Sequence, residues 1–183
     1  MLCVLVSACL LGQKVRYDGA DAARPNPILD RWVEQGRVVP FCPEVAGGLG
    51  VPRPAAEIVG GDGGAVLDGT ARVVTAAGTE VTGAFRVGAH GALEQARTGN
   101  VCLAILKDGS PSCASTSIYD GTFTGTRRPG VGVTAAILER QGIRVFSEGQ
   151  FEEAAAYLNA LEPDVSVAGR ADRSTITRQK KTR

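Results

Sequence analysis

Two long apolar segments constrain the fold of this chain more than any other feature. Leu2 to Ala8 and Val101 to Lys107 are almost continuously apolar, without alternation between apolar and polar residues. Strands of this composition are buried on both faces, as in parallel sheets that carry helices on each side. The two segments are therefore predicted to be inner strands of such a sheet.

Helical signals separate the predicted strands. Asn26 is a suitable N-cap with Pro27 at the first helical position, and Gly36 ends that helix. Thr82 is expected to cap a longer helix that ends at Gly99. Alternating strands and helices with short connections predict an open, mostly parallel α/β sheet with helices on both faces. Further strands are expected at Val38–Phe41 and Ile143–Phe146, and further helices at Val133–Arg140 and Phe151–Leu161.

A glycine-rich segment interrupts this alternation. From residue 57 to residue 82, short apolar stretches are separated by glycines. Ala65–Leu67 and Ala71–Thr75 flank the dipeptide Asp68-Gly69, which favours a two-residue hairpin turn. We therefore expect a small β-hairpin insertion in the α/β fold.

Length and charge indicate one domain followed by a basic tail. The chain has 183 residues and a formal net charge of +1. One core can bury most of the surface of a chain this long, so residues 1–162 are expected to form a single domain. Residues 163–183 have few apolar and many basic residues, which is typical of a disordered tail. The small net charge argues against a general nucleic-acid binder, although the tail leaves open a weak RNA or anionic contact.

The apolar segment near the N-terminus raises the question of export. It is too short to span a bilayer, lacks a basic leader and a small-residue cleavage pattern, and is followed at once by Gln13, Lys14 and Arg16. We therefore expect a cytoplasmic protein without a membrane partner. In that reducing compartment, unpaired cysteines are ligands or core residues more often than disulfides.

Three of the five cysteines follow the ends of predicted strands. Cys9, Cys42 and Cys113 occur in the contexts SACLLG, FCPE and SPSC. Ligands of open α/β sheets bind outside the carboxyl ends of the strands, so these thiols are expected to meet at one site. Cys3 and Cys102 begin their strands at the opposite end and are expected to face the core.

The available cysteines and histidine limit which metal or cluster three thiols could bind. Zinc takes a fourth Cys or His in a closed site, or three ligands plus water in a catalytic one. His90, the sole histidine, lies within a predicted helix, where a surface or packing role is expected. A 4Fe-4S cluster is usually bound by four cysteines, so three would leave one iron open to a soft donor such as sulfur.

Several short motifs occur together and in order along the chain: SACLLG with RYDG, CPE followed by GL and PR, LK with SPSC, and YDGTF. In these motifs the chain resembles the 2-thiouracil desulfidase family, over about residues 1 to 160. The resemblance implies a 4Fe-4S enzyme that removes sulfur from a small thiolated pyrimidine and is sensitive to oxygen. It implies that Cys9, Cys42 and Cys113 ligate the cluster and that Glu44 and Ser110 act at the substrate.

Glu44 and Ser110 each have an expected catalytic role and an alternative structural role. Glu44 would shuttle a proton from attacking water to the ring nitrogen, or it would cap a helix. Ser110 would orient the substrate by hydrogen bonding, or it would be a turn residue before a proline. Further polar residues are expected in loops at the same edge of the sheet as the three cysteines. They would brace these loops through ion pairs or line a substrate pocket: Arg16, Asp18, Arg53, Glu57, Tyr119 and Asp120.

Two other functions fit parts of the sequence. A non-catalytic metal or thiol redox sensor would use the same three cysteines without a substrate pocket. A nucleotide-binding module would use Gly130–Ala135, whose glycine spacing matches the dinucleotide fingerprint. The dinucleotide fingerprint must follow a strand, but this segment follows Thr124–Pro129, which is expected to be a loop. The sequence context therefore argues against nucleotide binding.

Overall fold

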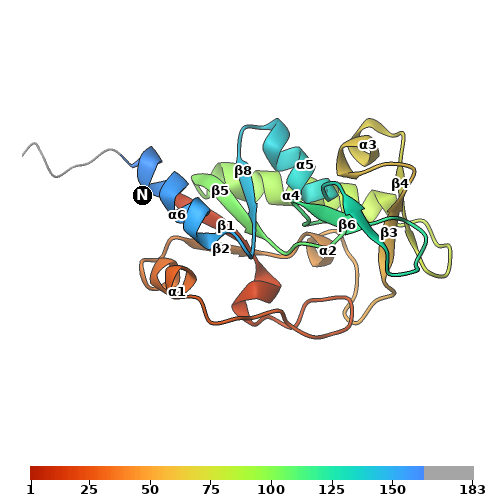
Figure 1. Cartoon of the computed structure of the whole chain (residues 1–183), viewed down its shortest axis with the longest axis horizontal. Helices are drawn as coiled ribbons and strands as arrows, with labels where there is room; N and C mark the ends of the chain where they lie inside the picture. The colour runs from red at the N-terminus through yellow and green to blue at the C-terminus, as the bar shows by residue number, and fades with distance from the viewer. Residues whose placement is uncertain (163–183) are drawn as a thin grey trace, which may run out of the picture.

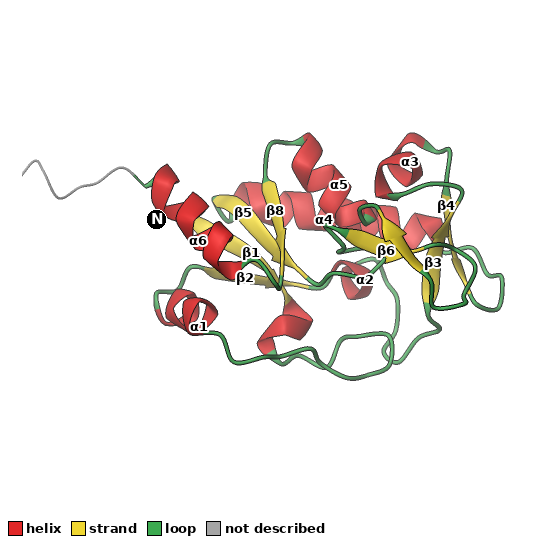
Figure 2. Ribbon diagram, in the orientation of Figure 1, coloured by secondary structure: helices red, strands yellow, loops and turns green. Residues whose placement is uncertain are grey.

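A computed structural model describes residues 1–162, and the predicted basic tail at 163–183 lies outside the described residues. The main sheet of the protein has four parallel strands in the order β2-β1-β5-β8 (Figures 1 and 2). The sequence prediction of a parallel α/β sheet is therefore confirmed. The strands of this sheet are β1 (Cys3–Ser7), β2 (Val38–Phe41), β5 (Val101–Leu106) and β8 (Arg144–Ser147).

Helices cover both faces of the sheet, as predicted. Helices α1 (Pro27–Glu34) and α6 (Phe151–Leu161) lie on one face, where Val4 and Leu103 are fully buried. Helices α4 (Thr82–Thr98) and α5 (Val133–Arg140) lie on the other (Figure 1). Inner strands enclosed in this way explain why β1 and β5 are apolar on both faces.

The helix starts agree with the sequence in one case and differ in another. Asn26 caps α1, since its Oδ1 accepts hydrogen bonds from the amides of Ile28 at 3.0 Å and Leu29 at 3.1 Å. The prediction that Thr82 caps α4 was wrong, because Val81 is the N-cap. The Thr82 hydroxyl instead accepts a hydrogen bond from the Val73 amide at 3.0 Å, which ties α4 to a neighbouring strand.

The glycine-rich segment forms an antiparallel pair, but from other residues than expected. Strand β3 (Ala56–Val59) pairs with β4 (Arg72–Thr75). The expected strand at Ala65–Leu67 belongs to helix α3 (Gly63–Asp68), which Asp62 caps through the Ala65 amide. Gly69 has a φ of +80° and ends this helix. A left-handed glycine serves a helix C-terminus as well as a hairpin turn, which is why the dipeptide misled the prediction.

A second antiparallel pair joins β6 (Ser117–Tyr119) to β7 (Arg127–Pro129), beside β3 (Figure 1). The prediction of a loop throughout Thr124–Pro129 was therefore wrong over the last three residues. Strand β7 is antiparallel and lies outside the main sheet, so the glycine-rich segment after it lacks the parallel strand that a dinucleotide fingerprint needs. Gly132 has a packing role instead, because an added Cβ would overlap the Ser112 backbone.

Among residues 1–162, no helix has both the length and the apolar character needed to cross a membrane.

Candidate functional site

The carboxyl ends of β1, β2 and β5 open into a cavity of about 490 Å³. Cys9 lies in a 3-10 turn (Ala8–Leu11) directly after β1, and Cys42 is the N-cap of the short helix α2 (Pro43–Ala46) after β2. Cys113 lies in the loop after β5. All three side chains line the cavity. Because β1 is hydrogen-bonded to both β2 and β5, residues more than a hundred positions apart meet here.

Burial governs the acidity of these thiols. It raises the pKa of Cys9 to about 11, with a further contribution from nearby Cys42, while Lys107 and Arg16 oppose the rise. Burial also raises the pKa of Cys42 and, together with the charge of Glu44, that of Cys113. Thiols in such surroundings are weak nucleophiles. A cationic group bound between them would stabilise the thiolates, since metal ligation requires deprotonated cysteine.

The donor set fits a cluster better than a single ion. Among residues 1–162, no group of three His, Cys, Asp or Glu side chains is arranged to hold one metal ion. A lone zinc needs each sulfur within about 2.3 Å, so its ligands must crowd together. Three cysteines and no histidine are among the residues that line the cavity, and cysteine thiolates are the usual ligands of iron-sulfur clusters.

The remaining cysteines and the histidine lie elsewhere. Cys3 and Cys102 are half-buried at the opposite end of β1 and β5, and the thiol of Cys102 contacts the Cys3 carbonyl oxygen at 3.4 Å. Cys102 packs against the core as predicted, although neither residue is fully buried. His90 is exposed on α4, in agreement with its expected surface role.

Glu44 is held by a buried ion pair at the cavity. Its Oε2 accepts from Arg53 Nη2 at 2.6 Å and Nε at 2.8 Å, with the two side chains 15% and 7% exposed. The same guanidinium donates to the Val15 carbonyl oxygen at 3.0 Å. Glu44 therefore does not cap α2; it is fixed in orientation by an arginine that also braces the loop after β1.

Ser110 connects two of the cysteine segments. Its hydroxyl donates to Oε1 of Glu44 at 3.1 Å and accepts from the amides of Ser112 at 3.0 Å and Cys113 at 3.2 Å. The expected turn role is therefore observed, since the Ser110 hydroxyl accepts from two amides of its own loop. Ser110 also lines the cavity, and its role toward a substrate stays a prediction. Its hydrogen bonds couple the position of Cys113 to the Cys42–Glu44 segment.

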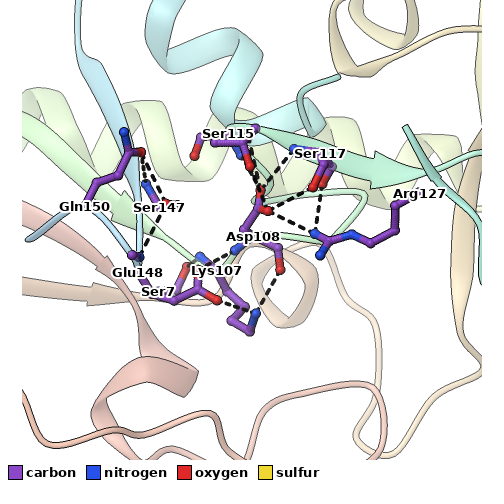
Figure 3. Close-up of polar contacts among 11 residues, drawn as sticks. Ser7, Lys107, Asp108, Ser115, Ser117, Arg127, Ser147, Glu148 and Gln150 are labelled. Atoms are coloured by element: carbon purple, nitrogen blue, oxygen red, sulfur yellow. Dashed lines mark hydrogen bonds and ion pairs between the residues drawn. The ribbon is translucent and has the colours of Figure 1, made fainter. Parts of the chain in front are cut away.

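A polar network that sequence reasoning missed surrounds the end of β5 (Figure 3). Asp108 accepts hydrogen bonds from the amides of Ser115, Thr116 and Ser117 and from Arg127. Although burial acts in the opposite direction, the hydrogen bonds from Thr116 and Ser117 lower the pKa of Asp108 to about 2.

The adjacent Lys107 is held in a second part of this network. Its ammonium pairs with Glu148 Oε1, and Glu148 Oε2 accepts from the Asp108 amide at 2.7 Å. Lys107 and Asp108 line the cavity. Asp108 lies two residues after the end of β5, and Glu148 directly follows β8. The expectation that functional residues follow strand ends, which pointed to the cysteines, would therefore also have found these two.

The other predicted rim residues divide into two groups. Arg16, Arg53, Glu57 and Tyr119 line the cavity. Asp18 forms an ion pair with Arg16 at 2.9 Å near the surface. Asp120 accepts hydrogen bonds from the amide and hydroxyl of Thr122. These two carboxylates therefore stabilise the loops in which they lie.

Comparison with known proteins gives consistent matches over most of the chain. A family model described as 2-thiouracil desulfurase matches residues 4–150. The chain is 45% identical over 150 residues to the uncharacterized protein YbbK of Bacillus subtilis (strain 168), covering 82% of this chain and 98% of YbbK. It is also similar to the solved structure of the [4Fe-4S]-dependent thiouracil desulfidase TudS, with 46% identity and a TM-score of 0.80, over 87% of this chain and 99% of TudS.

Proposed function

This chain belongs to the 2-thiouracil desulfurase family, and on that premise we propose that it converts a thiolated pyrimidine such as thiouracil into the oxo compound and hydrosulfide. It is an enzyme that cleaves a C–S bond, and its cofactor is a 4Fe-4S cluster. We assign Cys9, Cys42 and Cys113 as the cluster ligands, and Glu44 and Ser110 as the catalytic residues. The activity is assigned to one domain of residues 1–162.

The observation that supports this assignment is the lining of the cavity. It contains three cysteines from three separate segments and a carboxylate beside them. Three thiolates leave one iron of a 4Fe-4S cluster without a protein ligand. When bound, such a cluster supplies a Lewis-acidic iron with an open position for the substrate sulfur.

The reaction requires no change of oxidation state. Water contributes its oxygen to the carbon that bore sulfur, the C–S bond breaks, and sulfur leaves as hydrosulfide. The protein's task is to move protons between the water, the ring and the leaving group. Glu44 takes the proton from the attacking water and delivers it to the ring nitrogen.

The contacts of Glu44 are compatible with this role. Arg53 binds Oε2 only, while Oε1 accepts a single hydrogen bond, from Ser110. A carboxylate oxygen has two lone pairs, so Oε1 retains room for a water proton. Arg53 keeps the carboxylate in position throughout, which makes it a positioning residue rather than a catalytic one.

Ser110 has one proton to donate, and in the structure that proton goes to Glu44. A substrate carbonyl competes for the same donor, which orients the ring with its reactive carbon next to the carboxylate. We further propose a cytoplasmic location, because all five cysteines are free and an iron-sulfur enzyme benefits from a reducing compartment.

The test is turnover by anaerobically reconstituted protein, measured as uracil and sulfide released from 2-thiouracil. Glu44→Gln should keep the visible absorption of the cluster and lower kcat about a hundredfold or more, as expected for loss of a general base. Glu80→Gln is the matched control, because Glu80 is 52% exposed in a surface pair with Arg72. Wild-type turnover by Glu44→Gln would contradict the assigned role.

A further inference from the structure

A buried glutamate on the cavity wall has no role in the mechanism above. Glu57 lies on β3, is only 8% exposed, and lines the cavity. A buried carboxylate is costly unless it is hydrogen-bonded. Its partners are two backbone amides, those of Gly121 at 2.9 Å and Phe123 at 3.1 Å, and both bind Oε2.

The second oxygen of Glu57 is left available. Among residues 1–162, no hydrogen bond reaches Oε1 and no cation forms an ion pair with this carboxylate. An ionised carboxylate accepts on both oxygens and has about four lone-pair positions. Oε1 is therefore a free acceptor in a residue that is more than nine-tenths buried at the cavity.

The loop held by Oε2 brings an aromatic side chain to the same cavity. Phe123 lines it and has a φ of +59°, a left-handed conformation that is a rare outlier for a bulky residue. Such a conformation persists only where the surroundings fix it. Glu57 accepts the Phe123 amide, and Gly121 packs so close to β3 that an added Cβ would lie 2.7 Å from the Ile58 carbonyl oxygen.

From these contacts we propose that Glu57 and Phe123 are the residues that recognise the pyrimidine ring. Oε1 of Glu57 accepts a hydrogen bond from a ring N–H, and the Phe123 ring packs against the face of the heterocycle. Oε2 of Glu57 holds the loop that presents Phe123, so one carboxylate serves both contacts. The inference rests on the proposed function, because it states how the same cavity selects its substrate.

A carboxylate is required at position 57 because both of its oxygens face hydrogen-bond donors. Oε2 accepts from the loop amides, and Oε1 accepts from the ring N–H in the proposed complex. An amide has one acceptor oxygen and one NH₂ donor. The glutamine of Glu57→Gln can therefore accept from the loop amides or from the ligand N–H, but not from both. Its NH₂ group would face the remaining N–H donor, and no hydrogen bond would form there. The substitution keeps the size of the side chain and removes one of its two acceptors.

The test is calorimetric binding of uracil, the oxo product, to cluster-loaded protein, with 1-methyluracil and 3-methyluracil as probes. Wild-type protein should bind one methylated probe about ten- to a hundredfold more weakly than uracil, since a hydrogen bond to a charged group is lost. Glu57→Gln should weaken uracil binding by a similar factor and remove the discrimination between the probes. Phe123→Leu should weaken binding of all three ligands about tenfold.

Matched controls separate recognition from general loss of structure. Glu80→Gln changes an exposed glutamate, and Phe151→Leu changes a buried phenylalanine outside the cavity. Both should bind uracil like the wild type, and the Phe151 variant should only melt earlier. Equal binding of all three ligands by the wild type, or normal uracil binding by Glu57→Gln, would overturn the inference.

The outcome also distinguishes this inference from the proposed function. Selective uracil binding that depends on Glu57, without turnover of any thiolated pyrimidine, would support the recognition pair and contradict the desulfidase. Full turnover with binding that is indifferent to Glu57 and Phe123 would do the reverse.

Discussion

Replacing Arg53 by methionine should strongly destabilise the protein. The guanidinium binds Glu44 Oε2 through two nitrogens and also donates to the carbonyl oxygens of Val15 and Gly50. With side chains 7% and 15% exposed, this is a buried pair. Breaking such a pair leaves a buried charge uncompensated and costs roughly 3–5 kcal/mol.

The loss can be measured by urea denaturation of the cluster-free chain. Trp32, the only tryptophan, is 5% exposed and reports unfolding by fluorescence. With an m-value of about 2 kcal/mol per M, the urea midpoint should fall by about 1.5–2.5 M. Glu44→Gln combined with Arg53→Met should be more stable than Arg53→Met alone, because the double variant has no unpaired charge.

Arg140→Met is the matched control. Arg140 also forms a two-nitrogen pair, with Asp68 at 2.8 Å, but these side chains are 45% and 57% exposed. Water and salt screen an exposed pair, so its loss should move the midpoint far less. Equal shifts for Arg53→Met and Arg140→Met, or strict additivity in the double variant, would refute the reasoning.

Two other substitutions test the scaffold of the site. The pKa of Asp108 is lowered to about 2, from an ordinary value of 3.8, so its stabilising contribution is present above pH 4 and is lost as the pH falls through 2. The urea midpoints of wild type and Asp108→Asn should therefore differ at pH 6 and converge toward pH 2; a constant difference would contradict this. Gly88→Ala should displace α2 and reduce cluster retention, because a Cβ on Gly88 would overlap the Pro43 carbonyl. Gly83→Ala on the same helix meets nothing within 4 Å and should retain the cluster; similar behaviour of the two variants would contradict the packing argument.

The sequence predicts those parts of the fold in which local pattern and tertiary environment agree. The apolar runs identify β1 and β5, and the caps and glycines give the bounds of α1 closely. The convergence of Cys9, Cys42 and Cys113 was predictable because parallel strands end at one edge of the sheet. No property of the individual strands, however, specifies the order β2-β1-β5-β8.

The parts that sequence reasoning missed depend on pairing between segments. Asp68-Gly69 suits a hairpin turn and a helix end equally, so only the contacts of α3 decide between them. The Glu44–Arg53 and Glu57–Phe123 contacts arise from loops that meet across the cavity. Neither residue type nor spacing indicates in advance which carboxylate will meet which donor.

Iron and acid-labile sulfide, measured per chain under strict exclusion of oxygen, test the central claim most directly. Wild-type protein should contain about four of each, and so should Cys3→Ala and Cys102→Ala, because these cysteines lie at the far end of the sheet. Cys9→Ala, Cys42→Ala and Cys113→Ala should each lose most of the iron. Full iron in Cys113→Ala, or equal losses in all five variants, would contradict a cluster bound by these three residues.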